Sequence, residues 1–136
     1  MKIDGIKNGI VIDHITAGKA MQLYTMLGID KLDCCVAVIQ NVNSVKMGKK
    51  DMIKIDASIS IDLDVIGYVS PNATINIIEN GVIVRKEHID LPKKLTNIIY
   101  CKNPRCITTT EQEINHIFTL SDKGEYRCLY CETAAN

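Results

Sequence analysis

The sequence predicts an α+β fold in two parts, a sandwich of helices and sheet over residues 1–92 and a small antiparallel β domain over residues 93–136. Three observations lead to this prediction. Apolar residues recur with strand and helix periods, in the order strand, helix, strand, strand, helix, strand. Residues 88–94, which include Pro92, interrupt this pattern and are expected to form a linker. Four of the six cysteines follow the interruption in two close pairs.

The first strand and helix are predicted within residues 9–28. Residues 9–15 (GIVIDHI) are β-branched and bounded by a glycine, as in a buried strand. Thr16 can then cap a helix whose apolar residues, over 20–27, follow helical spacing. Gly28 suits the left-handed residue that ends such a helix.

The second and third strands are expected at residues 34–40 and 51–56, on either side of the lysine-rich loop 46–50. Cys34 and Cys35 would then point to opposite faces of the second strand as small apolar residues. Their alternative role is that of a redox pair, for which no activating base lies nearby in the sequence.

A second helix and a hairpin complete the sandwich. Ser60 or Asp62 can cap a helix through residues 63–69, which must end before Pro71. Residues 74–78 and 82–85 flank an Asn-Gly pair, a strong hairpin signal. This order of elements is that of a ferredoxin-like α/β sandwich.

The C-terminal cysteines have the spacing of ligands to one metal ion. Cys101 and Cys106 form Cys-x4-Cys, and Cys128 and Cys131 form Cys-x2-Cys. Two such pairs can complete a zinc tetrahedron with Zn–S bonds of about 2.3 Å, and four thiolates leave no open coordination position. We therefore expect one structural Zn2+, which would replace a hydrophobic core in this short domain. Three short strands, at 97–101, 116–120 and 125–130, would carry the ligands.

Composition excludes several classes of protein. Lys plus Arg and Asp plus Glu both count 16, so no net charge attracts nucleic acid or membranes. No apolar run approaches the roughly 20 residues that cross a bilayer, and the N-terminal residues lack the charged-then-apolar pattern that is typical of a signal peptide. Free thiols and a thiolate metal site fit a reducing compartment, so we expect a cytoplasmic protein.

Several polar residues in the first domain suggest an anion site. Lys50 and Lys54 share one face of a predicted strand, and Lys86 ends a later strand. Asp13 and His14 at a strand end could meet a ribose and its phosphates. The alternatives are a solvated lysine face and a surface strand end.

Asn76 lies on an otherwise apolar strand, so its amide needs a partner from the backbone or from a ligand if it is buried. The sequence contains neither a phosphate-binding glycine motif nor an evident pair of nucleophile and base. Nothing in these residues therefore indicates catalysis.

Four blocks of sequence, in order, resemble the regulatory chain of aspartate carbamoyltransferase. These blocks are GIVIDHI at 9–15, MGKKDMIKI at 47–55, PNATIN at 71–76 and the cysteine quartet. The resemblance covers essentially the whole chain. It implies an allosteric nucleotide-binding domain over residues 1–92 and, over residues 93–136, a zinc domain that contacts catalytic chains.

The resemblance also implies a function and a site. The chain would be a non-catalytic subunit of pyrimidine biosynthesis that dimerises, with three dimers bridging two catalytic trimers, and that binds CTP, ATP and, in some members, UTP. The backbone of the N-terminal segment would recognise the base, Asp13 would meet the ribose and His14 the phosphates. Gly81 stands where a well-known form of the family has tyrosine, so only its backbone can contribute. The residues carried over are Ile3, Asp4, Gly5, Ile6, Val11, Asp13, His14, Lys50, Lys54, Asn76, Gly81, Ile83 and Lys86.

Two other functions remain open at this point. One is a zinc-ribbon protein that binds nucleic acid, against which the balanced charge and the scarcity of aromatic residues count. The other is a free-standing nucleotide sensor, which differs only in lacking a catalytic partner.

Overall fold

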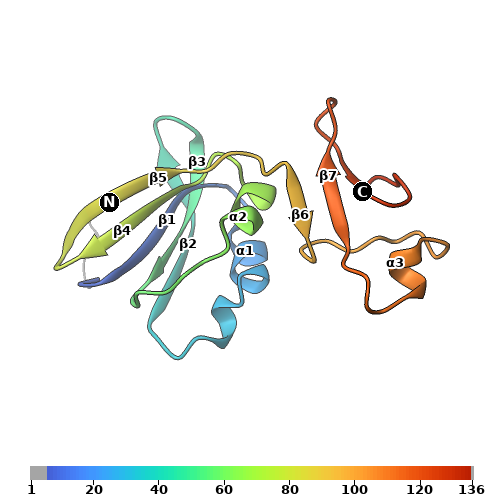
Figure 1. Ribbon diagram of the computed structural model, residues 1–136. Coiled ribbons are helices and arrows are strands. Elements are labelled where there is room, and N and C mark those ends of the chain that lie inside the picture. The colour runs from blue at the N-terminus through green and yellow to red at the C-terminus, as the bar shows by residue number, and fades with distance from the viewer. Residues whose placement is uncertain (1–5, 136) are drawn as a thin grey trace. The chain divides into compact units, whose positions relative to one another are not determined.

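The computed structural model describes residues 6–135, and the chain divides between Leu91 and Pro92 into two compact units (Figure 1). The first unit is built on five strands and the second on three. No helix among these residues is long and apolar enough to span a membrane.

The first unit contains an antiparallel sheet with the strand order β2-β3-β1-β4-β5. Its strands are β1 (Gly9–Thr16), β2 (Val36–Ser44), β3 (Gly48–Ile55), β4 (Thr74–Glu79) and β5 (Val82–His88). The first four have the order of the predicted ferredoxin-like sandwich, and β5 extends the sheet through the Asn80-Gly81 turn. Both turn residues have positive φ, 52° and 78°, as the Asn-Gly hairpin requires.

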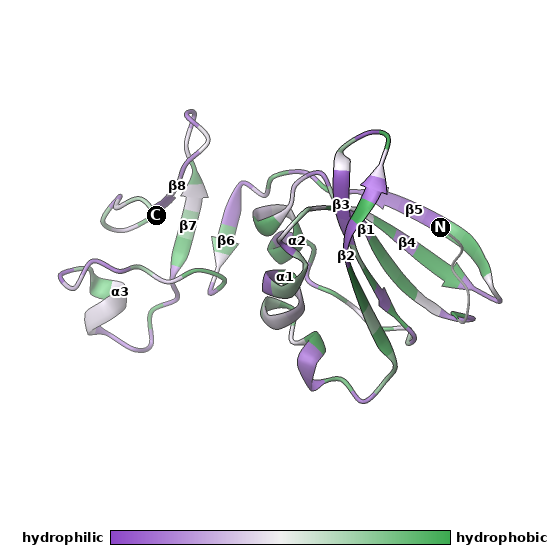
Figure 2. Ribbon diagram, turned by 180° about the vertical axis from the view of Figure 1, so that it is seen from behind, coloured by the Kyte–Doolittle hydropathy of each residue, from purple (hydrophilic) through white to green (hydrophobic). Residues whose placement is uncertain are grey.

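Two helices cover one face of this sheet (Figure 1). They are α1 (Ala20–Met26), which is followed by the short 3-10 helix η1 (Ile29–Lys31), and α2 (Leu63–Val69). Leu23 and Ile66 of the helices are fully buried, as are Ile12 and Ile53 of the sheet. Hydrophobic residues are concentrated on the central strands β1 and β4 (Figure 2). Alternation of side chains along each strand therefore assigns one face to the helices, while the other face carries both polar and apolar side chains.

Irregularities in β1 and β2 alter this alternation at one end of the sheet. The register of β1 against β3 shifts between Ile12 and Ile15, and that of β2 shifts between Ile39 and Val42. Ile12 and Ile15 are both buried and lie opposite Ile53 and Asp51, which share a face of β3. The two residues between Ile12 and Ile15 are therefore directed to the other face, away from the helices.

The second unit has a small three-stranded sheet and one turn of helix. Its elements are β6 (Lys94–Thr96), α3 (Ile107–Thr110), β7 (Ile117–Leu120) and β8 (Tyr126–Cys128), with β7 between the other two strands. Leu95, Phe118 and Tyr126 are its buried large apolar residues. These three side chains form only a small hydrophobic core for a unit of 45 residues.

Three predictions about local structure are wrong. Thr16 belongs to β1, and the residue that caps α1, Lys19, makes no side-chain capping bond. Cys34 and Cys35 precede β2, which begins at Val36. Residues 97–101 contain no strand; β6 lies just before them and begins at Lys94, the last residue of the predicted linker.

Other predictions about local structure are confirmed. Asp62 caps α2 and accepts the N–H of Asp64 at 3.0 Å. Gly28, just past the end of α1, has the left-handed φ of 70°.

Candidate functional site

The four cysteines of the second unit converge on one point. Cys101 follows β6, Cys106 is the N-cap of α3, Cys128 ends β8 and Cys131 lies in the following turn. Their sulfur atoms all lie within 4.8 Å of one another, with Sγ–Sγ distances of 3.5 Å for Cys101–Cys131 and 3.7 Å for Cys106–Cys128. A regular ZnS4 tetrahedron requires about 3.8 Å between sulfurs, so these residues fit a structural zinc ion.

Hydrogen bonds around the cysteines prepare them as thiolate ligands. The hydroxyl of Thr133 lies 3.2 Å from Cys131 Sγ and lowers the pKa of that thiol to about 6. Thr108 Oγ1 lies 3.1 Å from Cys106 Sγ and likewise lowers its pKa. Burial raises the pKa of Cys101 to about 12, so this thiol would lose its proton only with the metal in place.

A row of side chains crosses the helix-free face of the first unit's sheet. Lys54 of β3, Val11 of β1, Asn76 of β4 and Lys86 of β5 are successive cross-strand partners. Neighbours in such a row have Cβ atoms about 5 Å apart and point the same way. The fold therefore brings four predicted site residues, from four strands, into one line.

Asn76 is the polar centre of this row. Its side chain is 6% exposed, and its Oδ1 has no hydrogen-bond partner within residues 6–135. A buried amide oxygen without a partner costs about 1–3 kcal/mol. The sequence left two possible partners for this amide, the backbone or a ligand. No described backbone group bonds its oxygen.

Three more predicted residues lie to one side of the row, around the β1 bulge. Asp13 and His14 are the two residues of the bulge, and His14 has a φ of 57°. Lys50 Nζ lies 2.9 Å from Asp13 Oδ1, and His14 Nδ1 lies 2.9 Å from Thr74 Oγ1. These groups form a polar cluster on the face that carries Val11.

The electrostatics of this cluster favour an anion. Burial is the largest cause that lowers the pKa of His14; Asp13 opposes it, whereas the positive charges of Lys50, Lys86 and Lys46 lower it further. Three ammonium groups thus act on one imidazole. An anion bound among them would offset their repulsion.

A pocket of about 370 Å3 opens beside this cluster. His14, Lys46 and His88 line it, together with Asn72 and Asp90. Lys46, Thr74 and His88 were not among the predicted site residues. The lysine-rich loop 46–50 was the available sequence signal for Lys46, whereas His88 is placed here only by its pairing with Thr74 across β4 and β5.

Apolar residues pack around Val11, which belongs to the row. Ile6, Val11 and Ile78 form a buried cluster with Met52, and Ile83 lies opposite Ile78 with half of its surface exposed. Gly81, in the β4–β5 turn, donates its N–H to the carbonyl of Lys7 at 2.9 Å. The predicted residues Ile3, Asp4 and Gly5 lie outside the part of the chain that the structure describes.

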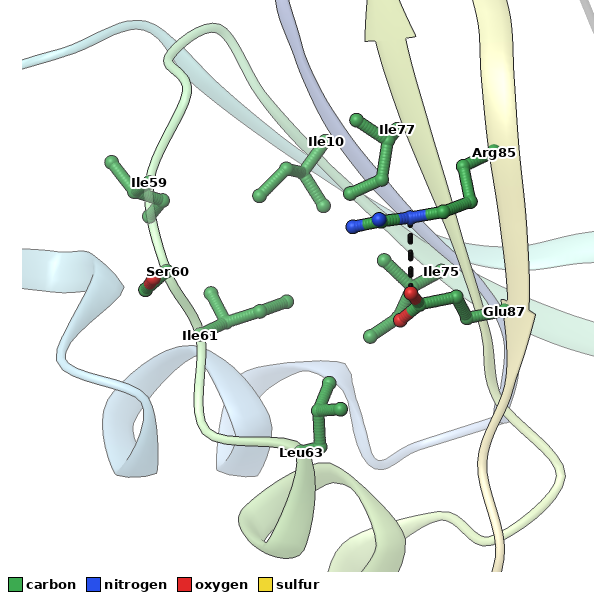
Figure 3. Close-up of a pocket in the computed structure, with 9 residues that line it drawn as sticks. All are labelled: Ile10, Ile59, Ser60, Ile61, Leu63, Ile75, Ile77, Arg85 and Glu87. Carbon is green, nitrogen blue, oxygen red and sulfur yellow. Dashed lines mark ion pairs between the residues drawn. The ribbon is translucent and has the colours of Figure 1, made fainter.

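A second pocket, of about 270 Å3, lies on the opposite face of the sheet (Figure 3). Ile10, Ile75 and Ile77 of the sheet and Ile59 and Ile61 of the loop before α2 line it. At its edge the guanidinium of Arg85 pairs with Glu87 at 3.0 Å. None of the predicted site residues lines this pocket, so it is separate from the polar row.

Both units match families of known proteins. Residues 1–90 match the allosteric domain of the aspartate carbamoyltransferase regulatory chain, and residues 93–136 match its metal binding domain. Three similar proteins bear the name aspartate carbamoyltransferase regulatory chain. That of Clostridium botulinum strain Hall is 49% identical over 97% of this chain and 92% of its own length. Those of Clostridium tetani and Bifidobacterium longum are 48% and 42% identical, covering 97% and 99% of this chain and 94% and 99% of their own lengths.

Proposed function

This chain belongs to the family of aspartate carbamoyltransferase regulatory chains, which is the non-catalytic chain of that enzyme, and we propose that it senses nucleoside triphosphates. CTP and ATP, and in some relatives UTP, would bind the helix-free face of the first unit. The zinc unit would pass the effect to catalytic chains in pyrimidine biosynthesis.

The observation that carries this proposal is the buried, unpartnered Oδ1 of Asn76 between two lysines of the same row. A buried acceptor of this kind is satisfied by a ligand that donates a hydrogen bond, as ribose hydroxyls and base amino groups do. Lysine ammonium groups suit phosphate oxygens as mobile point charges. One face thus offers both kinds of contact that a nucleotide needs.

The face carries an apolar part and a charged part, and a nucleotide needs both. Ile6, Val11 and Ile78 provide an apolar floor for a base, while Lys50, Lys46 and His14 gather where the phosphates would lie. An apolar floor accepts a purine or a pyrimidine. Opposite effects of CTP and ATP would then follow from how each base stabilises one state of the assembly, typically by about 1–3 kcal/mol.

Calorimetry of CTP binding to the full chain tests the site. Lys86→Ala should weaken binding about 10- to 100-fold, the usual cost of one charge-assisted hydrogen bond. Lys49→Ala is the matched control, because exposed Lys49 is adjacent to Lys50 on β3 and points to the opposite face. Equal affinities for the wild-type chain and Lys86→Ala would exclude Lys86 from the site.

We propose that the zinc unit contacts the catalytic chains through apolar residues beside the cysteines. Ile107 follows Cys106, and Leu129 and Tyr130 lie between Cys128 and Cys131. Each of the three is 47–50% exposed and is adjacent in sequence to a cysteine of the zinc site. Exposed apolar residues that are grouped together mark sites of protein–protein contact. Leu129→Ser should retain zinc yet reduce co-purification of catalytic chains, whereas Lys123→Ser, in an exposed turn, should change neither.

The chain is also proposed to dimerise, with three dimers bridging two catalytic trimers. Strands β2 and β5 are the edges of the sheet, and edge strands present unpaired backbone groups that can pair with a second copy. Sedimentation equilibrium of the purified chain would reveal the dimer. A monomer at all concentrations would argue for the free-standing sensor instead.

A further inference from the structure

A buried carboxylate, Asp51, holds the start of α1. Its side chain is 0% exposed, and Oδ2 accepts the N–H groups of Gly18 at 2.9 Å and Ala20 at 3.1 Å. Its Oδ1 accepts the N–H of Asn41 in β2 at 2.9 Å. These three backbone donors compensate for the cost of burying the carboxylate.

Asp51 lies where both neighbouring strands are irregular. On one side Ile15 pairs with Asp51 just after the bulge of β1, and on the other Asn41, with a φ of 61°, lies in the irregularity of β2. The side chain of Asp51 thus fixes the β2 irregularity directly. Its backbone borders the bulge that presents Asp13 and His14.

The residue before Asp51 faces the polar cluster. Lys50 and Asp51 are consecutive in a strand, so their side chains point to opposite faces of the sheet. Lys50 pairs with Asp13 on one face, and Asp51 holds α1 on the other. One peptide unit therefore connects the phosphate end of the proposed nucleotide site to the helical layer.

The start of α1 depends on this contact. Lys19, at its N-cap, makes no side-chain capping bond, and the first turn of α1 contains no acidic residue. A displacement of Asp51 thus removes the cap of Ala20 and the hydrogen bond of Gly18 together.

We propose that Asp51 is a positioning residue that couples nucleotide occupancy at Lys50 and Asp13 to the start of α1. The inference rests on the proposed function, because the signal begins with a nucleotide at that site. When a phosphate competes with Asp13 for Lys50, the end of β3 and the β1 bulge adjust. Asp51 carries this adjustment to Gly18, Ala20 and Asn41.

Amide hydrogen exchange of the full chain, with CTP as the probe, tests the coupling. Calorimetry first establishes saturation. The amides of Gly18, Ala20 and Asn41 should then change their exchange rates by about fivefold or more, the lower range of allosteric couplings. The amide of Arg105, which bonds Asn103 Oδ1 in the zinc unit, is the internal control and should not change. Unchanged exchange at Gly18, Ala20 and Asn41 under saturating CTP overturns the inference.

A pair of variants separates coupling from capping. Asp51→Asn keeps the size of the side chain but replaces one acceptor oxygen with a donor, so it should bind CTP with nearly wild-type affinity and lose the response of the α1 amides. Asp62→Asn makes the same change at the cap of α2 and should keep the response. A full response in Asp51→Asn overturns the inference, and if this variant does not fold, wild-type exchange decides. Absence of CTP binding by the wild-type chain overturns the proposed function and the inference with it, whereas binding without a response overturns the inference alone.

Discussion

Lys50 Nζ donates to Asp13 Oδ1 at 2.9 Å, and both side chains are only 16% exposed. Burial by itself would raise the pKa of Asp13. The hydrogen bonds from Lys50 and from the His14 N–H, with the nearby positive charges, outweigh burial and lower that pKa from its ordinary value of 3.8. The pair therefore favours the ionised carboxylate.

This ion pair should contribute to stability in a defined pH range. Because the pKa of Asp13 is lower in the folded chain, its contribution is fully present above about pH 4 and is lost as the pH falls through the folded value. Asp13→Asn lacks this contribution. Urea unfolding of both proteins between about pH 6 and pH 2 should give a difference that is largest at the higher pH. The acid response of the zinc unit is common to both, so a difference independent of pH would contradict the prediction.

Loss of one zinc ligand should unfold the second unit alone. Structural zinc contributes apparent free energies of about 10–16 kcal/mol, which three large apolar residues cannot replace. Cys128→Ser should purify without metal, and its NMR spectrum should lose the dispersed signals of residues 92–136 while those of the sheet in the first unit remain. Cys35→Ser changes an exposed cysteine outside the site and should keep one zinc per chain. Tightly bound zinc in Cys128→Ser would contradict the four-ligand assignment.

The hydroxyl of Thr108 should strengthen zinc binding. Thr108 is 3% exposed, and its Oγ1 lies 3.1 Å from Cys106 Sγ. Groups that bond to metal ligands typically contribute about 10- to 100-fold in affinity, so Thr108→Val should lose zinc to a competing chelator at lower concentration. Thr110→Val, which changes an exposed threonine two residues further along α3, should retain zinc as the wild type does. Equal competition curves for all three proteins would remove Thr108 from the site.

Gly9 should not tolerate a side chain. A Cβ at this position would collide with the backbone carbonyl oxygen of Ile55 on β3. Gly9→Ala should therefore lower the free energy of unfolding by roughly 1–3 kcal/mol, the usual cost of overpacking, as measured by urea titration. Glu79→Ala, at an exposed position near the end of β4, should cost less than about 0.5 kcal/mol. If Gly9→Ala unfolded at the same urea concentration as the wild type, β1 and β3 would have to separate locally to admit the new side chain.

Local signals allowed most of the first unit to be predicted from sequence. The Asn80-Gly81 turn, the Asp62 cap and the Gly28 stop each depend on conformations that neighbouring residues determine. The metal site could be predicted in the same way, because the two cysteines of each pair are separated by only a few residues. The wrong assignment at Thr16 has a different cause, because α1 is capped by Asp51, more than 30 positions along the chain. A contact between distant segments leaves no periodic pattern.

The bulges explain what the sequence did not show about the candidate site. Strict alternation would send Asp13 and His14 to opposite faces, whereas the extra residue in β1 directs both to one face. Lys46 and His88 likewise join His14 only through the folded β3 and β5 ends. In the second unit, Asn97 has a φ of 56°, and the N–H groups of Asn97 and Cys101 both bond to His116. These contacts hold residues 97–101 in a loop, so the β-branched pair at 98–99 misled the prediction.

At position 76, stability and ligand recognition favour different residues. An isoleucine there would extend the apolar strand Ile75–Ile78 and remove an unsatisfied atom, so a sequence selected for rigidity alone would not contain this amide. Attempts to make the chain more heat-resistant by redesigning its core would therefore replace Asn76 early. They would yield a more stable chain without the amide on which the proposed nucleotide site depends.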